Sequence, residues 1–60
     1  MNTIRVNITI NNLPEEITRE YVVVRRDDDG SLWYWGQYDD YAEASYAAVA
    51  IGNGFVVEVE

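Results

Sequence analysis

The side chains of this sequence that could take part in chemistry are almost all carboxylates. The chain of 60 residues has eleven Asp and Glu against four Lys and Arg, a net charge of −7, and it lacks both His and Cys. Catalysis would depend on carboxylates with Tyr, Ser or Thr, and a carboxylate pair is the arrangement that hydrolyses glycosides. A chain this short leaves little room for a pocket that excludes water, so we expect a protein that is not an enzyme and needs no cofactor.

The most concentrated acidic segment is Asp27-Asp28-Asp29-Gly30, which superficially resembles a calcium-binding loop. Aligning Gly30 with the invariant glycine of such a loop places Arg25 at the first ligand position and Gly36 where a bidentate Glu belongs. The alignment fails, and the absence of Cys and His excludes the usual structural zinc site, so we expect no bound metal. The segment is instead typical of a solvated hairpin turn, with a contact to a basic partner as the alternative.

Acidic residues recur along the whole chain, and a row of them can imitate a nucleic-acid backbone. In an extended strand Glu58 and Glu60 are about 6.6 Å apart, which is roughly two phosphate steps of about 3.4 Å along one DNA strand. The alternatives are a negative surface that keeps a small protein soluble and a mimic of nucleic acid. The acidic residues that we predict to contact a partner are Asp27, Asp28, Asp29, Asp39, Asp40, Glu58 and Glu60.

The chain is also rich in aromatic residues, with Trp33-Tyr34-Trp35 as their densest run. Aromatic side chains on a sheet can stack on nucleic-acid bases, but such platforms need a positive groove, which a chain of this charge can hardly form. Anionic membranes are disfavoured for the same reason. The aromatic residues therefore indicate core packing or a protein interface, and those that we predict to bind a partner or form a dimer are Trp33, Trp35 and Tyr46.

The pattern of apolar residues predicts the elements that carry these side chains. Over residues 3–10 apolar and polar residues alternate, as in a strand with one buried face. The connection that follows contains Pro14, which either begins a short helical turn or shapes a loop. Residues 20–26 form an unbroken β-favouring run with apolar contacts on both faces, so we expect this strand at the centre of the sheet. The turn at 27–30 joins it to a strand over 31–38 as a hairpin.

A helix is predicted over residues 41–51. Asp40 and Glu43 form an N-terminal capping pair, the Ala-rich interior favours helix, and Gly52 permits a left-handed stop. Residues 55–60 then alternate again and predict a fourth strand that ends the chain.

The order β-β-β-α-β predicts an α+β fold in which one helix covers a four-stranded, mostly antiparallel sheet in two layers. Because a helix joins the last two strands, these should run in the same direction. The sequence leaves two positions for the fourth strand, beside the first strand or beside the third, and we favour the position beside the first strand. Residues 1–60 contain no repeat or linker and are predicted to form a single acidic domain.

One helix covers only one face of a sheet, so we expect the other face to be partly apolar and exposed. Simple alternation places Tyr34 and Tyr38 on one side of the third strand and Trp33 and Trp35 on the other. A domain of this size has a marginal core, and without disulfides or metal it depends on oligomerisation or a partner. We therefore expect a homodimer or a protein partner on the exposed face. The outward surface of the helix is also poor in polar residues: Ala42, Tyr46, Val49 and Ala50.

Acidic residues at 27–29, 39–40, 58 and 60 thus stand beside Trp33 and Trp35 in a short chain without Cys. In this combination the chain resembles the phage-encoded inhibitors of bacterial defence, anti-CRISPR proteins in particular. These proteins share no motif that would assign roles to residues. The resemblance implies an inhibitor that presents acids to the positively charged channel of a nuclease or surveillance complex and blocks its target DNA.

We therefore predict a non-enzymatic inhibitor, a DNA mimic, whose partner is a protein with a basic nucleic-acid-binding surface. The alternative is a homodimeric assembly module that pairs through its aromatic sheet face. The N-terminal segment lacks the basic region and long apolar run of a secretory signal, and no stretch approaches the length of a membrane span. We expect a cytoplasmic location, in the host cell if the protein is phage-encoded.

Overall fold

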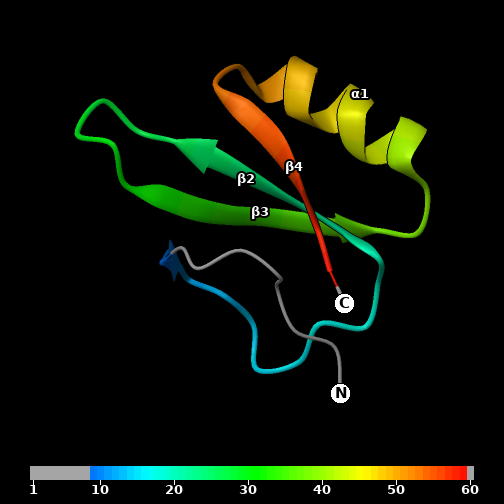
Figure 1. The fold of residues 1–60 in the computed structure, drawn as a ribbon. Helices are drawn as coiled ribbons and strands as arrows, with labels where there is room; N and C mark the ends of the chain where they lie inside the picture. Colours follow the sequence, from blue (N-terminus) through cyan, green and yellow to red (C-terminus); the bar gives the residue numbers. More distant parts are fainter. Residues whose placement is uncertain (1–8, 60) are drawn as a thin grey trace.

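The structure is a computed structural model that describes residues 9–59. Its elements in chain order are β1 (Ile10–Asn11), β2 (Tyr21–Arg26), β3 (Leu32–Tyr38), α1 (Tyr41–Ile51) and β4 (Gly54–Glu58), as Figure 1 shows. The α+β class and the order β-β-β-α-β are as predicted. Most of the first predicted strand, residues 3–8, lies outside the described part of the chain. The connection between β1 and β2 that contains Pro14 is a loop.

The four strands form one sheet in the order β1-β3-β2-β4. β2 is antiparallel to both β3 and β4, whereas β1 is parallel to β3. β3 and β4 therefore run in the same direction, as predicted for strands joined by a helix. The prediction that the fourth strand lies beside the first is wrong, because β4 pairs with β2, where Val22 faces Val57. β2, the most apolar strand, thereby gains a neighbour on each edge and is central, as predicted.

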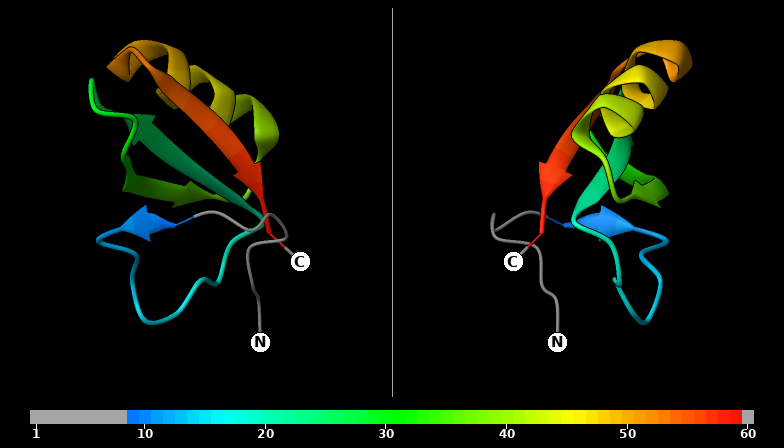
Figure 2. Two further views of the ribbon diagram at one scale, coloured as in Figure 1. Left: turned by 60° about the vertical axis from the view of Figure 1, so that its left-hand side comes forward. Right: turned by 90° about the vertical axis from the view of Figure 1, so that its right-hand side faces the viewer.

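α1 packs along one face of the sheet, over β2 and β4, and makes little contact with β3 (Figure 2). We call this face the helix side. Its buried core consists of Val23, Ala44 and Ala48. The small Ala side chains let the helix approach the strands closely, and a Cβ at Gly54 would lie only 2.6 Å from the Ala48 carbonyl oxygen. Glycine is therefore required where α1 meets the start of β4.

Both ends of α1 are capped, at Asp40 and at Gly52, but the predicted capping pair of Asp40 with Glu43 does not form, because no hydrogen bond among residues 9–59 reaches the Glu43 carboxylate. Asp40 is extended, with φ −119° and ψ 129°, and its carboxylate accepts a hydrogen bond from the Ala42 backbone N–H at 3.0 Å. Glu43 places a negative charge in the first turn, where the helix dipole favours it. Gly52 has a φ of 72° and ends the helix, and its N–H donates to the Val49 carbonyl oxygen at 3.3 Å.

The opposite face, which we call the Ile17 side, is covered by the chain itself. Ile17 comes from the loop between β1 and β2 and packs on Val22 and Val24, which are fully buried. Gln37 on β3 fastens the loop, because its Oε1 accepts a hydrogen bond from the Thr18 backbone N–H at 2.9 Å. The expectation of an exposed apolar face is therefore wrong on this side. The loop supplies a cover that its sequence pattern does not indicate.

A β-bulge in β3 changes which side chains share a face. Val23 pairs with Gly36 and Val24 with Tyr34, so Trp35 has no partner in register on β2. Beyond the extra residue the alternation is reversed. Tyr34 therefore packs on the Ile17 side and Tyr38 on the helix side. The prediction that these two tyrosines lie on the same side is wrong for this reason.

Candidate docking surface on the helix side

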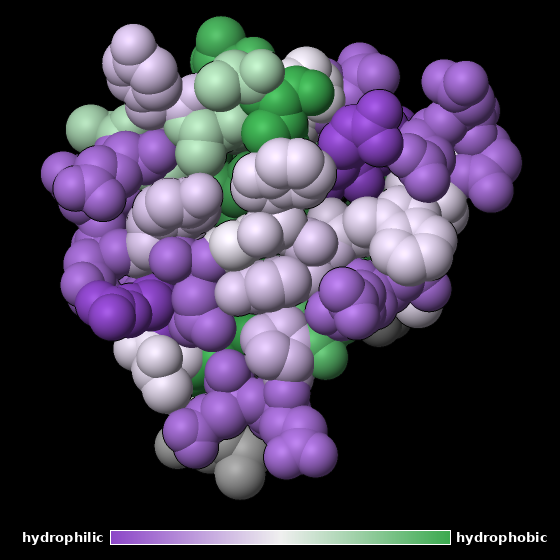
Figure 3. Space-filling view, turned by 180° about the vertical axis from the view of Figure 1, so that it is seen from behind, coloured by the Kyte–Doolittle hydropathy of each residue, from purple (hydrophilic) through white to green (hydrophobic). Residues whose placement is uncertain are grey.

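The outer surface of α1 exposes apolar side chains to solvent. Tyr46 and Val49 are each 80% exposed, and Glu43 is the only charged residue of the helix. From behind, where α1 lies, neutral and apolar residues form a band bordered by hydrophilic residues (Figure 3). We call the outer surface the helix face, and a depression of about 590 Å³ on it is lined by Tyr41, Ala42, Ser45, Tyr46, Val49 and Ala50.

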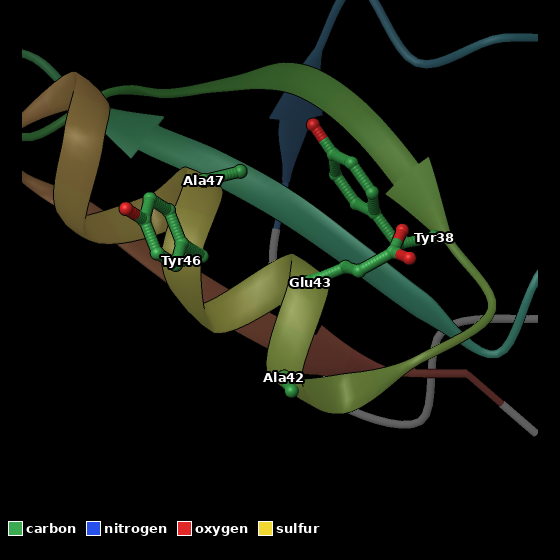
Figure 4. A pocket seen from close by; sticks show the side chains of 5 residues that line it. All are labelled: Tyr38, Ala42, Glu43, Tyr46 and Ala47. Carbon is green, nitrogen blue, oxygen red and sulfur yellow. The ribbon is translucent and has the colours of Figure 1, made fainter.

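A second depression lies between α1 and the end of β3 (Figure 4). It exists because α1 lies over β2 and β4 and leaves most of β3 uncovered. The Glu43 side chain extends from the helix toward Tyr38, and Tyr46 stands on the far side of Glu43. We call this depression, of about 440 Å³, the Tyr38 groove, and its lining residues are Tyr38, Ala42, Glu43, Tyr46 and Ala47. Because the two depressions share Ala42 and Tyr46, they form one continuous surface.

The position of the Tyr38 ring depends on its neighbours in the sheet. A Cβ at Gly36 would lie 3.1 Å from the Tyr38 hydroxyl oxygen, so the ring lies back along β3 over this glycine. Tyr21 faces Tyr38 across the β2–β3 pair. The Tyr21 ring also meets Tyr41 edge-to-face, with ring centroids 5.6 Å apart. Contacts between aromatic side chains at this end of the sheet thus position Tyr38, which lines the Tyr38 groove, and Tyr41, which lines the depression on the helix face.

The two predicted tryptophans lie on β3 and are half-exposed, at 44% for Trp33 and 54% for Trp35. Trp33 faces Arg25 across the hairpin, and alternation along β2 puts both on the helix side. The Trp33 indole N–H donates to the Ser31 hydroxyl oxygen at 3.1 Å. Neither tryptophan lines the helix face or the Tyr38 groove. Of the three predicted aromatic contacts, only Tyr46 belongs to this surface.

The predicted acidic residues lie at two ends of the sheet. Residues 27–29 form the β2–β3 turn, whereas residues 39–40 and Glu58 lie at the opposite end, where α1 begins and β4 ends. β2 has six residues, so these ends are roughly 20 Å apart. α1 extends from one of these ends to the other. It begins after Asp40, and just beyond its last turn the Asn53 backbone carbonyl oxygen accepts a hydrogen bond from the Arg26 backbone N–H at 2.9 Å, next to the β2–β3 turn. Glu60 lies outside the described residues, and so does the predicted row with Glu58.

Several of these carboxylates are engaged within the protein. Asp27 accepts a hydrogen bond from Arg25 Nη1 at 2.9 Å, and Asp39 forms an ion pair with Arg19. Asp40 caps the helix. Their first role is therefore to hold the hairpin, the loop and the helix, although exposed carboxylates still contribute to the negative potential of both ends.

Asp29 is held by the residue that closes the hairpin turn. The Ser31 hydroxyl donates to its carboxylate at 2.6 Å and the Ser31 backbone N–H donates at 2.9 Å. These two hydrogen bonds favour the charged form, the hydroxyl first, and lower the pKa of Asp29 below its ordinary value. The turn is thus organised by the acidic segment that the sequence singles out.

The Tyr38 groove is a part of the surface that the sequence does not predict. Glu43, Tyr46 and Ala47 are three and four residues apart, so they share a stripe of the helix, and this spacing was a usable signal. Tyr38 has no such signal in the sequence. The face of the sheet on which Tyr38 lies depends on the bulge at Trp35, and its exposure depends on the position of α1 over β2 and β4.

Among residues 9–59 no three acidic side chains converge as a metal site would require. Within the same range, no helix has the length and apolar character of a bilayer span. Comparisons with protein-family models, curated proteins and solved structures found no match to this chain. Its function is therefore inferred from the chemistry of the helix face, the Tyr38 groove and the two acidic ends.

Proposed function

We propose that the protein is a non-enzymatic inhibitor that binds a partner protein on the partner's basic, nucleic-acid-binding surface. The supporting observation is an exposed apolar helix face on a molecule with a net charge of −7. Opposite charge steers two proteins together, and desolvated aromatic side chains then supply contact area. A surface that normally binds phosphates offers the matching positive charge.

The two acidic ends support a mimic of nucleic acid. They are roughly 20 Å apart, close to six phosphate steps of about 3.4 Å along one strand. The helix face lies between them, so a channel that grips phosphates over this length contacts acids at both ends and aromatic side chains at its middle. The acids thus set the position of the protein and the helix face supplies most of the desolvated area.

The resemblance to anti-CRISPR proteins makes bacterial CRISPR effector complexes the first class of partner to test. Such a partner places the protein in the cytoplasm of the infected cell. The inhibitor competes there with target DNA for the effector and has no affinity for the DNA itself, because its net charge repels phosphate.

A gel-shift assay with a panel of purified effector complexes and their labelled target DNA tests the proposal. We expect one complex to lose DNA binding at equimolar amounts of the protein, and the inhibition to weaken between about 50 and 200 mM salt. Inhibition that does not respond to salt contradicts the mimic, and tight binding of the protein to the DNA alone contradicts the whole proposal. Failure to inhibit any complex in the panel removes CRISPR effectors as the partner class.

A homodimeric assembly module is the second candidate, because Trp33 and Trp35 are half-exposed on the strand that α1 does not cover. Sedimentation equilibrium of the wild type and of a Trp33→Ser, Trp35→Ser double variant tests it. A dimer that pairs through β3 dissociates in the double variant. A wild-type protein that is monomeric at every concentration contradicts this candidate.

A further inference from the structure

We infer that the Tyr38 groove binds an arginine side chain of the partner protein, and that the helix face binds an apolar side chain next to that arginine. The inference rests on the proposed function, because it names the chemistry by which the helix side recognises a basic partner. The two sites adjoin along Tyr46, which lines both depressions.

The lining of the Tyr38 groove combines aromatic walls with one carboxylate. The rings of Tyr38 and Tyr46 lie on either side of Glu43, and Ala42 and Ala47 add small apolar surfaces. Aromatic faces attract cations, and an apolar surface accommodates the methylene stem of a long basic side chain. The groove is an open surface depression of about 440 Å³.

The Glu43 carboxylate gives the groove a negative charge that no described residue neutralises. No hydrogen bond or ion pair among residues 9–59 engages the exposed Glu43 carboxylate. Among residues 9–59 no cation lies at Glu43, because the arginines of this range are engaged elsewhere, two with aspartates and one over a phenylalanine ring: Arg19, Arg25 and Arg26. A cation from another molecule therefore complements this carboxylate.

A second copy of this chain does not supply that cation well. It would bring a further net charge of −7, with Arg19 and Arg25 paired to its own aspartates, and like charges across an interface are repulsive. A partner with a basic surface has both free cations and the opposite sign. The charge complementarity of the groove thus selects a different protein as its occupant.

Arginine suits the groove better than lysine. A guanidinium group is planar and weakly hydrated, so it can stack on an aromatic ring while it donates two hydrogen bonds to a carboxylate. The protein already places a guanidinium group over an aromatic ring at another site, where the Arg26 guanidinium carbon lies 5.4 Å from the centroid of the Phe55 ring. A lysine ammonium lacks the flat surface and the paired donors that such a site uses.

NMR titration of the ¹⁵N-labelled protein with a short peptide tests the inference. The probe is acetylated and amidated Ala-Leu-Arg-Leu-Ala, and the matched peptide carries citrulline, a neutral analogue of arginine, in place of Arg. We expect the arginine peptide to shift the amide signals of α1 and of the end of β3, and to bind about tenfold more tightly than the citrulline peptide. Equal binding of both peptides, or shifts confined to other elements, would overturn the inference.

Two variants of equal charge separate the groove from the general negative field. Glu43→Gln removes the carboxylate at the groove, whereas Glu16→Gln removes one from the exposed loop between β1 and β2. We expect Glu43→Gln to weaken the arginine peptide about tenfold and Glu16→Gln to change its affinity less than about twofold. Tyr46→Ala, at a side chain that is 80% exposed, tests the aromatic wall without disturbing the core. Equal losses in the two charge variants, or no loss in Tyr46→Ala, would contradict the inference.

The outcomes distinguish this inference from the proposed function. If Glu43→Gln inhibits an effector complex as well as the wild type does, the groove is not the contact and the inference fails, while the inhibitory function stands. If no effector is inhibited but the arginine peptide binds in the groove, the inhibitory function fails and the recognition of arginine stands. Signals of the groove that shift on dilution without peptide would show that a second copy occupies it, against the inference.

Discussion

The two faces of the sheet are closed by different kinds of structure. On the Ile17 side the loop between β1 and β2 places Ile17 against branched side chains of the sheet. On the helix side the cover is a cylinder about 10 Å wide, which spans two strands spaced about 4.8 Å apart. α1 lies over β2 and β4, so β3 remains open. The helix side alone therefore carries both the helix face and the Tyr38 groove.

Under the proposed function, this difference separates stability from recognition within a very small domain. Val22 and Val24 on the Ile17 side are fully buried, whereas Tyr46 and Val49 on the helix are each 80% exposed. Burial removes apolar surface from water and stabilises the fold, but exposed apolar surface contributes only when a partner covers it. The Ile17 side should therefore respond to substitution through stability, and the helix face through binding.

The largest effect is expected from removing the cover of the Ile17 side. Ile17→Ala deletes a side chain that is only 7% exposed and should lower the free energy of unfolding by about 3 kcal/mol. Urea denaturation followed by circular dichroism measures the change. The matched variant Val49→Ala also removes branched carbons, but from an exposed site, and should change stability by less than about 0.5 kcal/mol. Similar losses in both variants would show that the two faces do not differ as inferred.

A smaller effect is expected where α1 touches β4. Gly54→Ala places a Cβ about where the Ala48 backbone lies, 2.6 Å from its carbonyl oxygen, so the helix must move away from the strand. We expect a loss of about 2 kcal/mol by overpacking, measured by the same denaturation. Amide signals of α1 should shift while those of Ile17 and its loop do not. Full stability in this variant would refute the close contact between helix and strand.

The N-terminal cap of α1 should have a more modest effect on the helix side. Asp40→Ala removes the acceptor of the Ala42 N–H and should cost about 1 kcal/mol. Its neighbour provides the control, because Asp39→Ala breaks only an exposed ion pair with Arg19 and should cost a few tenths of a kcal/mol, roughly. Thermal unfolding of both variants shows which substitution lowers the stability more. A larger loss in Asp39→Ala would mean that the loop, not the cap, positions the helix.

Features set by a few neighbouring residues could be predicted from the sequence. The helix occupies 41–51 between Asp40 and Gly52, where the caps and the Ala-rich interior indicated it, and the hairpin follows the turn at 27–30. These signals are local, because each depends on hydrogen bonds between residues close in the chain. The place of β4 beside β2 could not be derived in this way, because strand order depends on which apolar faces meet across the whole sheet.

The residues of the candidate site likewise fall into those that a local pattern predicts and those that depend on the whole fold. Tyr46 was predicted because its exposure follows from the helical period alone. Tyr38 was not, since one extra residue at Trp35 reverses the side on which every later residue of β3 lies. The sequence predicts the acidic residues as a partner contact, yet Asp27 pairs with Arg25, two residues away, and Asp39 with Arg19, twenty residues away. The pairing of Asp39 with Arg19 across twenty residues leaves no local pattern in a sequence.

The smallest effect is expected at the hairpin turn, which belongs to neither covered face. Ser31 lowers the pKa of Asp29, so the charged Asp29 carboxylate stabilises the folded state. This contribution is fully present at a pH above the unfolded-state pKa of about 3.8, and it is lost as the pH falls through the folded-state pKa. Ser31→Ala removes the hydroxyl donor and should raise the pKa of Asp29 toward that value. Titration of the Asp29 carboxyl carbon by NMR measures the shift, with Asp28 in the same turn as the internal reference. An unchanged pKa in the variant would mean that the backbone N–H of residue 31 alone holds the carboxylate, and the turn would then keep its geometry without the hydroxyl.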